Sequence, residues 1–220
     1  MTLPEYDLRL CLVTDENMYR DEDHLARIVS CAVDGGVTMV QLREKQADRT
    51  SMIRKGLLLK EILRARNVPL IINDHVDVAL EVNAAGVHLG QSDMPVLQAR
   101  RLLGDRSIIG LSVETKEHAL VSNSLPVDYI GLSPVFSTTT KKDIAAPLGL
   151  EGVREITGLC RHSAMAIGGI DLQNAAEVIH AGANGVAVVS YLMQAPDVSA
   201  AARSMKDEIE KARKSSYHSR

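Results

Sequence analysis

The sequence has few aromatic residues: Trp is absent, Phe136 is the single phenylalanine, and tyrosine occurs 5 times in 220 residues. Proteins that bind single-stranded nucleic acid stack bases on aromatic side chains, so this scarcity counts against such a partner. Positive charge is not in excess either, because the formal net charge is -3. That balance gives no general attraction to nucleic acid or to an anionic membrane surface.

Cysteine and long apolar runs are also scarce. The three cysteines, Cys11, Cys31 and Cys160, are far apart and lack CxxC spacing. They are typical of reduced thiols in a cytosolic protein rather than of a disulfide or a zinc site. No apolar run approaches the ~18 residues of a membrane span, and the N-terminus lacks the pattern of a signal peptide. The sequence therefore predicts a cytoplasmic protein without a membrane partner, and a homo-oligomer is compatible with it.

Short apolar segments alternate with segments of helical periodicity along the whole chain. The predicted strands span residues 8–14, 37–42, 69–72, 86–89, 107–112, 128–132, 164–167 and 185–189. Their residues are mostly continuously apolar, as is typical of parallel strands covered on both faces. Eight strand–helix units predict an α/β fold, a (β/α)8 TIM barrel over residues 1–220 as a single compact domain. An open doubly wound sheet is the alternative, but no GxGxxG follows the first strand.

The positions of several glycines and of the irregular segments agree with this organisation. Gly35, Gly86 and Gly182 each stand between a predicted helix and a predicted strand, where glycine is expected to cap the helix. The longest irregular segment, residues 133–149, is predicted to be a mobile active-site loop. The basic, polar tail at 211–220 is predicted to be a frayed end.

Polar residues gather where several predicted strands end, after residues 40, 72 and 89. Unpaired charges are costly to bury, so such clusters have no use inside a core. In a barrel, the carboxyl ends of all strands surround one mouth, which is where active sites form. The clusters therefore indicate one shared site.

Asp74 and Asp93 follow two adjacent strands, so both carboxylates are expected at this mouth. Two carboxylates that leave room for substrate oxygens suit Mg²⁺, which retains waters and binds phosphates. The alternative for each is a helix N-cap, before Val76 and before Pro95 respectively. Capping is the favoured interpretation of either residue by itself. Their joint position opposite a basic cluster favours metal binding.

The basic cluster comprises Arg43, Lys45 and Lys141 on two predicted loops. Arginine offers a planar fork and lysine a mobile point charge to phosphate oxygens. The alternative is a solvated charged loop. Against it stands Gln41, an amide at the strand end that shares the orientation of Arg43 and Lys45 if side chains alternate. An inward amide with two cations beyond it fits a polar heterocycle that carries a diphosphate.

The ends of the seventh and eighth predicted strands carry Gly168-Gly169 and Val189-Ser190, where barrels of this kind often bind phosphate. A tight turn is the alternative for the glycine pair. Residues 138–141 offer hydroxyls to a second polar ligand, or form a lid. His88 lies inside the fourth strand, where a hydrogen-bonded core residue is the common case, and we assign it a substrate contact without an acid–base role.

The sequence resembles the thiamine phosphate synthase (thiamine-phosphate pyrophosphorylase) family over most of its length. The matching segments are LVTD at 12–15, QLREK at 41–45, NDHVDVAL at 73–80, GVHLGQSD at 86–93, SPVFSTTTK at 133–141, IGGI at 167–170 and VVS at 188–190. Because these segments occur in the same order along the chain, the resemblance is specific to this family. The resemblance implies a transferase that joins an aminopyrimidine methyl diphosphate to a thiazole phosphate and releases pyrophosphate.

The resemblance also implies roles for individual residues. Asp74 and Asp93 would hold Mg²⁺ on the diphosphate, and Ser112 would reach the pyrimidine or the leaving group. The diphosphate would be bound by Arg43, Lys45, Asn73 and Lys141, the pyrimidine by Gln41, and the thiazole phosphate by Thr138, Thr140, Gly169, Val189 and Ser190. The reaction of the family is dissociative, so it needs charge neutralisation and alignment more than acid–base catalysis.

Two residues depart from the family pattern: His75 stands where arginine is frequent, and Ser133 where glycine is usual. Two rival functions stay open. A thiazole tautomerase of the same fold needs neither the metal pair nor the cations, and a non-catalytic thiazole phosphate sensor needs a partner surface that the sequence does not offer.

Overall fold

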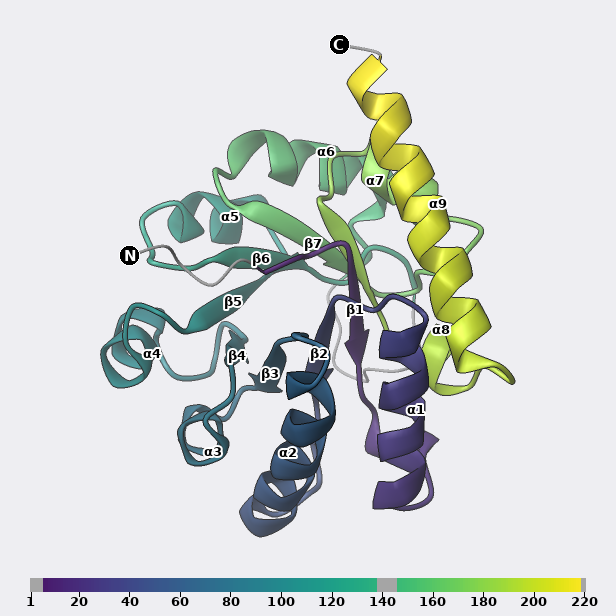
Figure 1. The fold of residues 1–220 in the computed structure, drawn as a ribbon. Coiled ribbons are helices and arrows are strands. Elements are labelled where there is room, and N and C mark those ends of the chain that lie inside the picture. The colour runs from purple at the N-terminus through teal and green to yellow at the C-terminus, as the bar shows by residue number, and fades with distance from the viewer. Residues whose placement is uncertain (1–5, 138–145, 219–220) are drawn as a thin grey trace.

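The strands of the chain close into a barrel. The computed structural model describes residues 6–137 and 146–218. Each strand pairs in parallel with the next, and β8 pairs with β1 (Figure 1). The strands are β1 (Leu10–Val13), β2 (Met39–Leu42), β3 (Leu70–Asn73), β4 (Gly86–Leu89), β5 (Ile108–Val113), β6 (Tyr129–Leu132), β7 (Ser163–Ile167) and β8 (Gly185–Val188). The predicted (β/α)8 barrel is confirmed.

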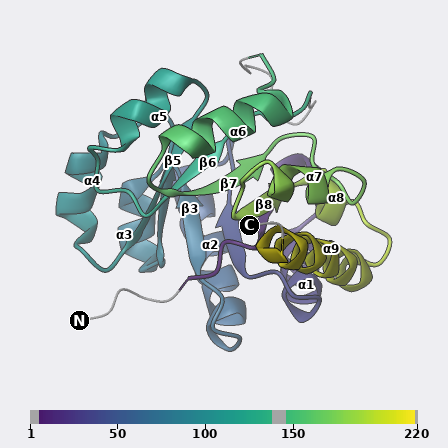
Figure 2. The ribbon, with the colours of Figure 1, turned by 90° about the horizontal axis from the view of Figure 1, so that it is seen from above.

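Helices surround the barrel and cover the outer faces of the strands (Figure 2). They are η1 (Glu16–Met18), α1 (Glu22–Asp34), α2 (Arg49–Arg64), α3 (Val76–Val82), α4 (Val96–Leu103), α5 (Lys116–Ser122), α6 (Gly149–Leu159), α7 (Ala175–His180), α8 (Ser190–Met193) and α9 (Val198–His218). None of the helices in the described part of the chain is long and apolar enough to cross a membrane.

Local sequence explains where several helices begin. Asp21 accepts a hydrogen bond from the His24 N–H at the start of α1, and Asp48 accepts one from Ser51 N–H at the start of α2. These are N-caps, which satisfy backbone donors that a helix leaves without partners. Helix α2 therefore starts shortly after the polar cluster that follows β2.

The core has two layers. One lies between the strands and the helices, and the other fills the barrel, where Cys11, Met39 and Tyr129 pack with Met165. A barrel interior filled by side chains is a packed core rather than a pore. The cysteines are free, as predicted. Burial raises the pKa of Cys11 far above its ordinary value, so this thiol stays protonated.

Two predictions about element ends are wrong. Gly86 does not cap α3, because Asn83 does so in the left-handed region at φ 52°. Gly86 instead begins β4, where a Cβ atom would lie 1.9 Å from the carbonyl oxygen of Ile108. The tail is not frayed from residue 211, because α9 continues to His218 and buries Ala212 against its neighbours.

Candidate active site

A cavity of about 820 Å³ opens at the carboxyl ends of the strands. Of the predicted site residues, it is lined by Gln41, Arg43, Lys45, Asn73, Asp74, His88, Asp93, Ser112, Gly169, Val189 and Ser190. Thr138, Thr140 and Lys141 lie outside the described residues. The structure thus brings every described member of the predicted set to one mouth, although the members come from six different strands or strand ends.

The side of the cavity beside β2 carries the cations. Gln41, Arg43 and Lys45 line the cavity together, as the alternation of side chains predicts. Two hydrogen bonds link this segment to Thr14, which follows β1: the Thr14 N–H donates to the carbonyl oxygen of Gln41, and the Arg43 N–H donates to the side-chain oxygen of Thr14, both at 3.0 Å. Among residues 6–137 and 146–218, no carboxylate forms an ion pair with Arg43. Its guanidinium is therefore available to an anion.

The two predicted metal ligands lie next to each other. Burial and a hydrogen bond with Asp74 raise the pKa of Asp93, and Lys45 forms an ion pair with Asp74. Asp93 also accepts a hydrogen bond from the Gly90 N–H at 2.7 Å. Neither aspartate caps a helix, because the N-cap of α3 is His75 and that of α4 is Pro95. The capping alternative is wrong for both, and the paired carboxylates remain without such a structural role.

The donor set fits a hard divalent cation. Within the described ranges, no group of three or more His, Cys, Asp or Glu side chains is arranged to hold a metal. Two carboxylate groups by themselves leave most positions around an octahedral Mg²⁺ to water and to phosphate oxygens, as that ion prefers. The two adjacent carboxylates repel each other, which helps to raise the pKa of Asp93. A bound cation would stabilise the charged form of both.

A hydrogen-bonded chain crosses the base of the cavity. The His88 ring lies 3.0 Å from the hydroxyl of Tyr129 through Nδ1, and 3.0 Å from Ser112 Oγ through Nε2. Tyr129 is fully buried, and this burial raises its pKa well above the ordinary value, so the phenol is protonated. Gly131 makes room for the imidazole, since a Cβ there would lie 2.7 Å from His88 Cε1. The chain orients the Ser112 hydroxyl at the cavity wall.

Sequence reasoning missed two members of this arrangement. Tyr129 begins an otherwise apolar strand, at the end opposite the polar clusters, so its position in the sequence did not mark it as part of the site. Gln91 lines the cavity and donates from Nε2 to the carbonyl oxygen of Ser112 at 2.5 Å. Its place between Gly90 and Ser92 in a polar cluster was a usable indication.

The part of the cavity beside β7 and β8 is built from backbone. Gly168 and Gly169 have φ values of 106° and 64°, in the left-handed region that favours glycine. A Cβ on Gly169 would lie 2.7 Å from the carbonyl oxygen of Ser137. Val189 and Ser190 follow β8 directly, and Ser190 begins α8. Exposed N–H groups and a hydroxyl at this position suit a phosphate group.

Comparison with known proteins gives consistent matches. A family model described as thiamine monophosphate synthase matches residues 10–192. The thiamine-phosphate synthase of Albidiferax ferrireducens is 51% identical over 203 residues, which cover 92% of each chain. That of Chloroflexus aurantiacus is 48% identical over 200 residues, 91% of this chain and 92% of the other.

Solved structures agree. The thiamine phosphate pyrophosphorylase from Pyrococcus furiosus superposes with a TM-score of 0.84 at 36% identity, covering 93% of this chain and 96% of that one. The orotidine 5'-phosphate decarboxylase from Pyrococcus horikoshii, at 14% identity and a TM-score of 0.68 over 90% of this chain and 99% of that one, shares the fold alone.

Proposed function

The chain belongs to the thiamine monophosphate synthase family, and on that premise we propose that its barrel mouth joins a pyrimidine diphosphate to a thiazole phosphate. The enzyme is a transferase of thiamine biosynthesis. The proposed substrates are 4-amino-2-methyl-5-(diphosphooxymethyl)pyrimidine and a thiazole phosphate, and the products are thiamine phosphate and pyrophosphate. The single observation that carries this proposal is the convergence of cations, paired carboxylates and a glycine-built phosphate site on one cavity.

The diphosphate is assigned to the side of the cavity beside β2 and β3. Arg43 has no competing ion pair among the described residues, and its fork matches two phosphate oxygens. Lys45 and Asn73 line the same wall, and Lys141, outside the described residues, is proposed to join them. Gln41, deeper in β2, is assigned to the edge of the pyrimidine, where its amide both donates and accepts.

The metal site is assigned to Asp74 and Asp93. Mg²⁺ held there would supply charge neutralisation on the leaving diphosphate. Lys45 forms an ion pair with Asp74 and also lines the cavity, so this lysine lies between the carboxylate pair and the proposed diphosphate position. The Gly90 N–H fixes one oxygen of Asp93 and so orients its carboxylate toward Asp74.

The thiazole phosphate is assigned to the part of the cavity beside β7 and β8. Gly169 and Ser190 present backbone N–H groups and a hydroxyl, and Val189 lies between β8 and α8. Thr138 and Thr140, outside the described residues, are proposed to add hydroxyls. The thiazole nitrogen and the pyrimidine methylene carbon are proposed to meet between these two phosphate positions.

This set of site residues suits a dissociative substitution. The C–O bond to the diphosphate breaks, the electron-rich aminopyrimidine stabilises the cation, and the thiazole nitrogen then attacks the methylene carbon. Such a step needs charge neutralisation, alignment and exclusion of water. His88 is engaged on both ring nitrogens, with Tyr129 and Ser112, which supports the assignment without an acid–base role. Its contact with the substrate is proposed from its place in the lining of the cavity.

Product analysis tests the proposal. The two substrates are incubated with the enzyme and Mg²⁺, and then with EDTA, and products are identified by mass spectrometry. Thiamine phosphate formed only with metal is the expected result. Metal-independent turnover would remove the two-aspartate site from the proposal. Binding of thiazole phosphate without any product would favour the tautomerase or sensor function.

A further inference from the structure

Glu44 is a buried carboxylate beside the site that the proposed chemistry does not use. It stands between Arg43 and Lys45, which line the cavity, yet its own side chain is fully buried. Because side chains alternate along an extended segment, Glu44 points away from the cavity, into the layer between β2 and the outer helices. An ion in that layer requires partners, since burial of an unpaired charge is costly.

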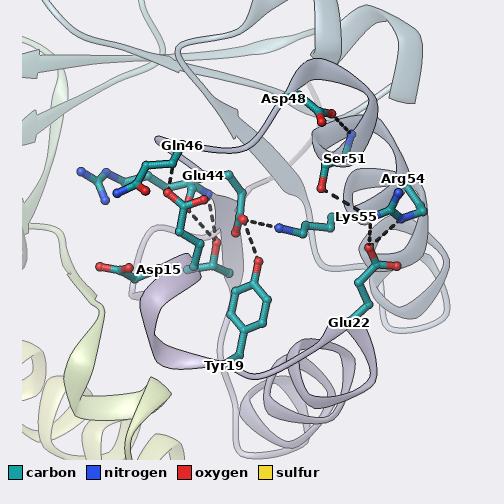
Figure 3. A network of polar contacts seen from close by, with 12 residues as sticks. Asp15, Tyr19, Glu22, Glu44, Gln46, Asp48, Ser51, Arg54 and Lys55 are labelled. Atoms are coloured by element: carbon teal, nitrogen blue, oxygen red, sulfur yellow. Dashed lines mark hydrogen bonds and ion pairs between the residues drawn. The ribbon is translucent and has the colours of Figure 1, made fainter.

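Two partners hold this carboxylate. Glu44 Oε2 accepts hydrogen bonds from the Tyr19 hydroxyl at 2.6 Å and from Lys55 Nζ at 2.5 Å (Figure 3). The Lys55 ammonium also lies 5.3 Å from the centre of the Tyr19 ring, in reach of a cation–π contact. Burial and Glu44 raise the pKa of Tyr19, so the phenol stays protonated and donates. The contacts join three segments: the turn after β2, helix α2, and the chain between η1 and α1.

Stability does not account for this arrangement. Glu44 Oε1 is buried and has no hydrogen-bond partner among the described residues. A buried acceptor left without a partner is costly, and a buried ion pair is often no more stable than an apolar replacement of the same shape. A group that costs stability beside an active site is expected to serve the site.

The same turn is tied at two further points. Thr14 Oγ accepts from the Arg43 N–H at 3.0 Å, and Glu16 Oε1 accepts from the Gln46 N–H at 2.7 Å. Together with the contacts of Glu44, these bonds hold the backbone on both sides of Lys45 against residues 14–19. The side chains of Arg43 and Lys45 leave from this backbone, so its position sets where their charges lie.

We propose that Glu44 is a positioning residue for the diphosphate site: its buried carboxylate anchors Tyr19 and Lys55, so that Arg43 and Lys45 project into the cavity at fixed positions. The inference rests on the proposed function. Glu44 touches no substrate and acts through the two cations. Its effect is therefore confined to the diphosphate side of the cavity, and the thiazole phosphate side at Gly169 and Ser190 is untouched.

The test uses two variants, Glu44→Gln, which keeps the shape but removes the charge, and Tyr19→Phe, which removes one donor. Steady-state kinetics give a separate KM for each substrate, and calorimetry gives the affinity for inorganic pyrophosphate with Mg²⁺. In both variants we expect the KM for the pyrimidine diphosphate to rise on the order of tenfold, because small misplacements of charged groups are costly in binding. Pyrophosphate affinity falls in parallel, and the KM for the thiazole phosphate stays unchanged.

Asp128→Asn is the matched control. Asp128 forms an ion pair with Arg100 whose side chains are 11% and 14% exposed, similar in burial to the Glu44 pair. It precedes β6, at the end of the barrel opposite the cavity. This variant is expected to lower thermal stability without changing either KM.

Four outcomes decide between the possible roles of Glu44. Unchanged KM and pyrophosphate affinity in both variants would make Glu44 a structural residue only, as would an equal rise of both KM values. If Glu44→Gln does not fold, Tyr19→Phe decides by the same measurements. A wild-type enzyme that makes no product, while the variants still lose pyrophosphate affinity, would overturn the proposed function and leave the positioning role in place.

Discussion

At the scale of single residues, the cavity contains charged groups that repel each other or that have no oppositely charged partner among the described residues. Asp74 and Asp93 lie side by side, and burial together with Asp74 raises the pKa of Asp93. Arg43 faces the cavity without an ion pair among the described residues. Such arrangements do not stabilise a fold, and they are typical of sites prepared for a ligand.

The carboxylate pair predicts a trade between stability and activity. The pKa of Asp93 is raised in the folded protein, so its neutral form is the more favourable one there. The contribution of this carboxyl to the free energy of unfolding is therefore fully present at low pH and is lost as pH rises through the raised pKa. Asp93→Asn removes this charge and keeps an acceptor for the Gly90 N–H. We expect the metal-free variant to melt on the order of 2 °C higher at pH 7, with a gain that shrinks toward pH 4, a modest effect because solvent screens the site.

Calorimetric melting across pH checks this prediction, and the same variant is expected to lose Mg²⁺-dependent turnover. A lower melting temperature at pH 7 would contradict the repulsion between the two aspartates. Asp105→Asn, an exposed aspartate in the turn between α4 and β5, serves as the control and is expected to change neither property.

Arg43 predicts a loss of substrate affinity without a loss of stability. Arg43→Lys replaces a planar fork by a point charge, so the KM for the pyrimidine diphosphate is expected to rise about tenfold. The melting temperature stays unchanged, because no ion pair of the described residues is broken. Arg49→Lys, on an exposed ion pair with Asp77, is the control for which neither quantity changes. An unchanged KM in Arg43→Lys would assign the diphosphate to other groups.

At the scale of elements, replacing glycine by alanine is expected to change stability in opposite directions at Gly86 in β4 and at Gly158 in α6. Gly86→Ala places a Cβ 1.9 Å from the Ile108 carbonyl oxygen, against backbone that cannot move away. We expect a loss of about 3 kcal/mol or more in the free energy of unfolding, or no folding. Gly158→Ala in α6 meets nothing within 4 Å and is expected to gain about 0.5–1 kcal/mol. Urea unfolding of both variants checks the contrast, which equal effects would contradict.

At the scale of the whole molecule, α9 joins the two ends of the chain. It packs against both α1 and α7 (Figure 2). These two helices are connected to β1 and β8, the strands that pair to close the barrel. Met205 and Ile209 are fully buried along this helix. The C-terminal helix therefore belongs to the core that closes the barrel.

Ile209→Ala is expected to lower the free energy of unfolding by about 2–5 kcal/mol, as buried large-to-small changes do. Leu120→Ala, at a leucine that is 54% exposed, is the control and is expected to change it by less than about 0.5 kcal/mol. Urea unfolding measures both. A small effect of Ile209→Ala would mean that the barrel closes without α9.

The architecture and the place of the site followed from sequence because both have local causes. The apolar run of residues 70–72 indicates a buried strand, and the polar residues Asn73 and Asp74 directly after it mark the carboxyl end of that strand. The alternation from Gln41 to Lys45 likewise follows from the geometry of extended backbone. Eight such units then require that their ends meet at one mouth.

Tertiary structure alone decided which groups touch. Helix α9 extends through the polar tail and buries Ala212, and Tyr129 reaches His88 from a strand 41 residues away. The pairing of Glu44 with Lys55 has the same origin. Each depends on the distance between side chains on different elements, and sequence spacing does not contain that distance. Sequence therefore determined which residues gather at the mouth, and the packing of the closed barrel determined how they are held there, because contacts between distant segments form only once the barrel closes.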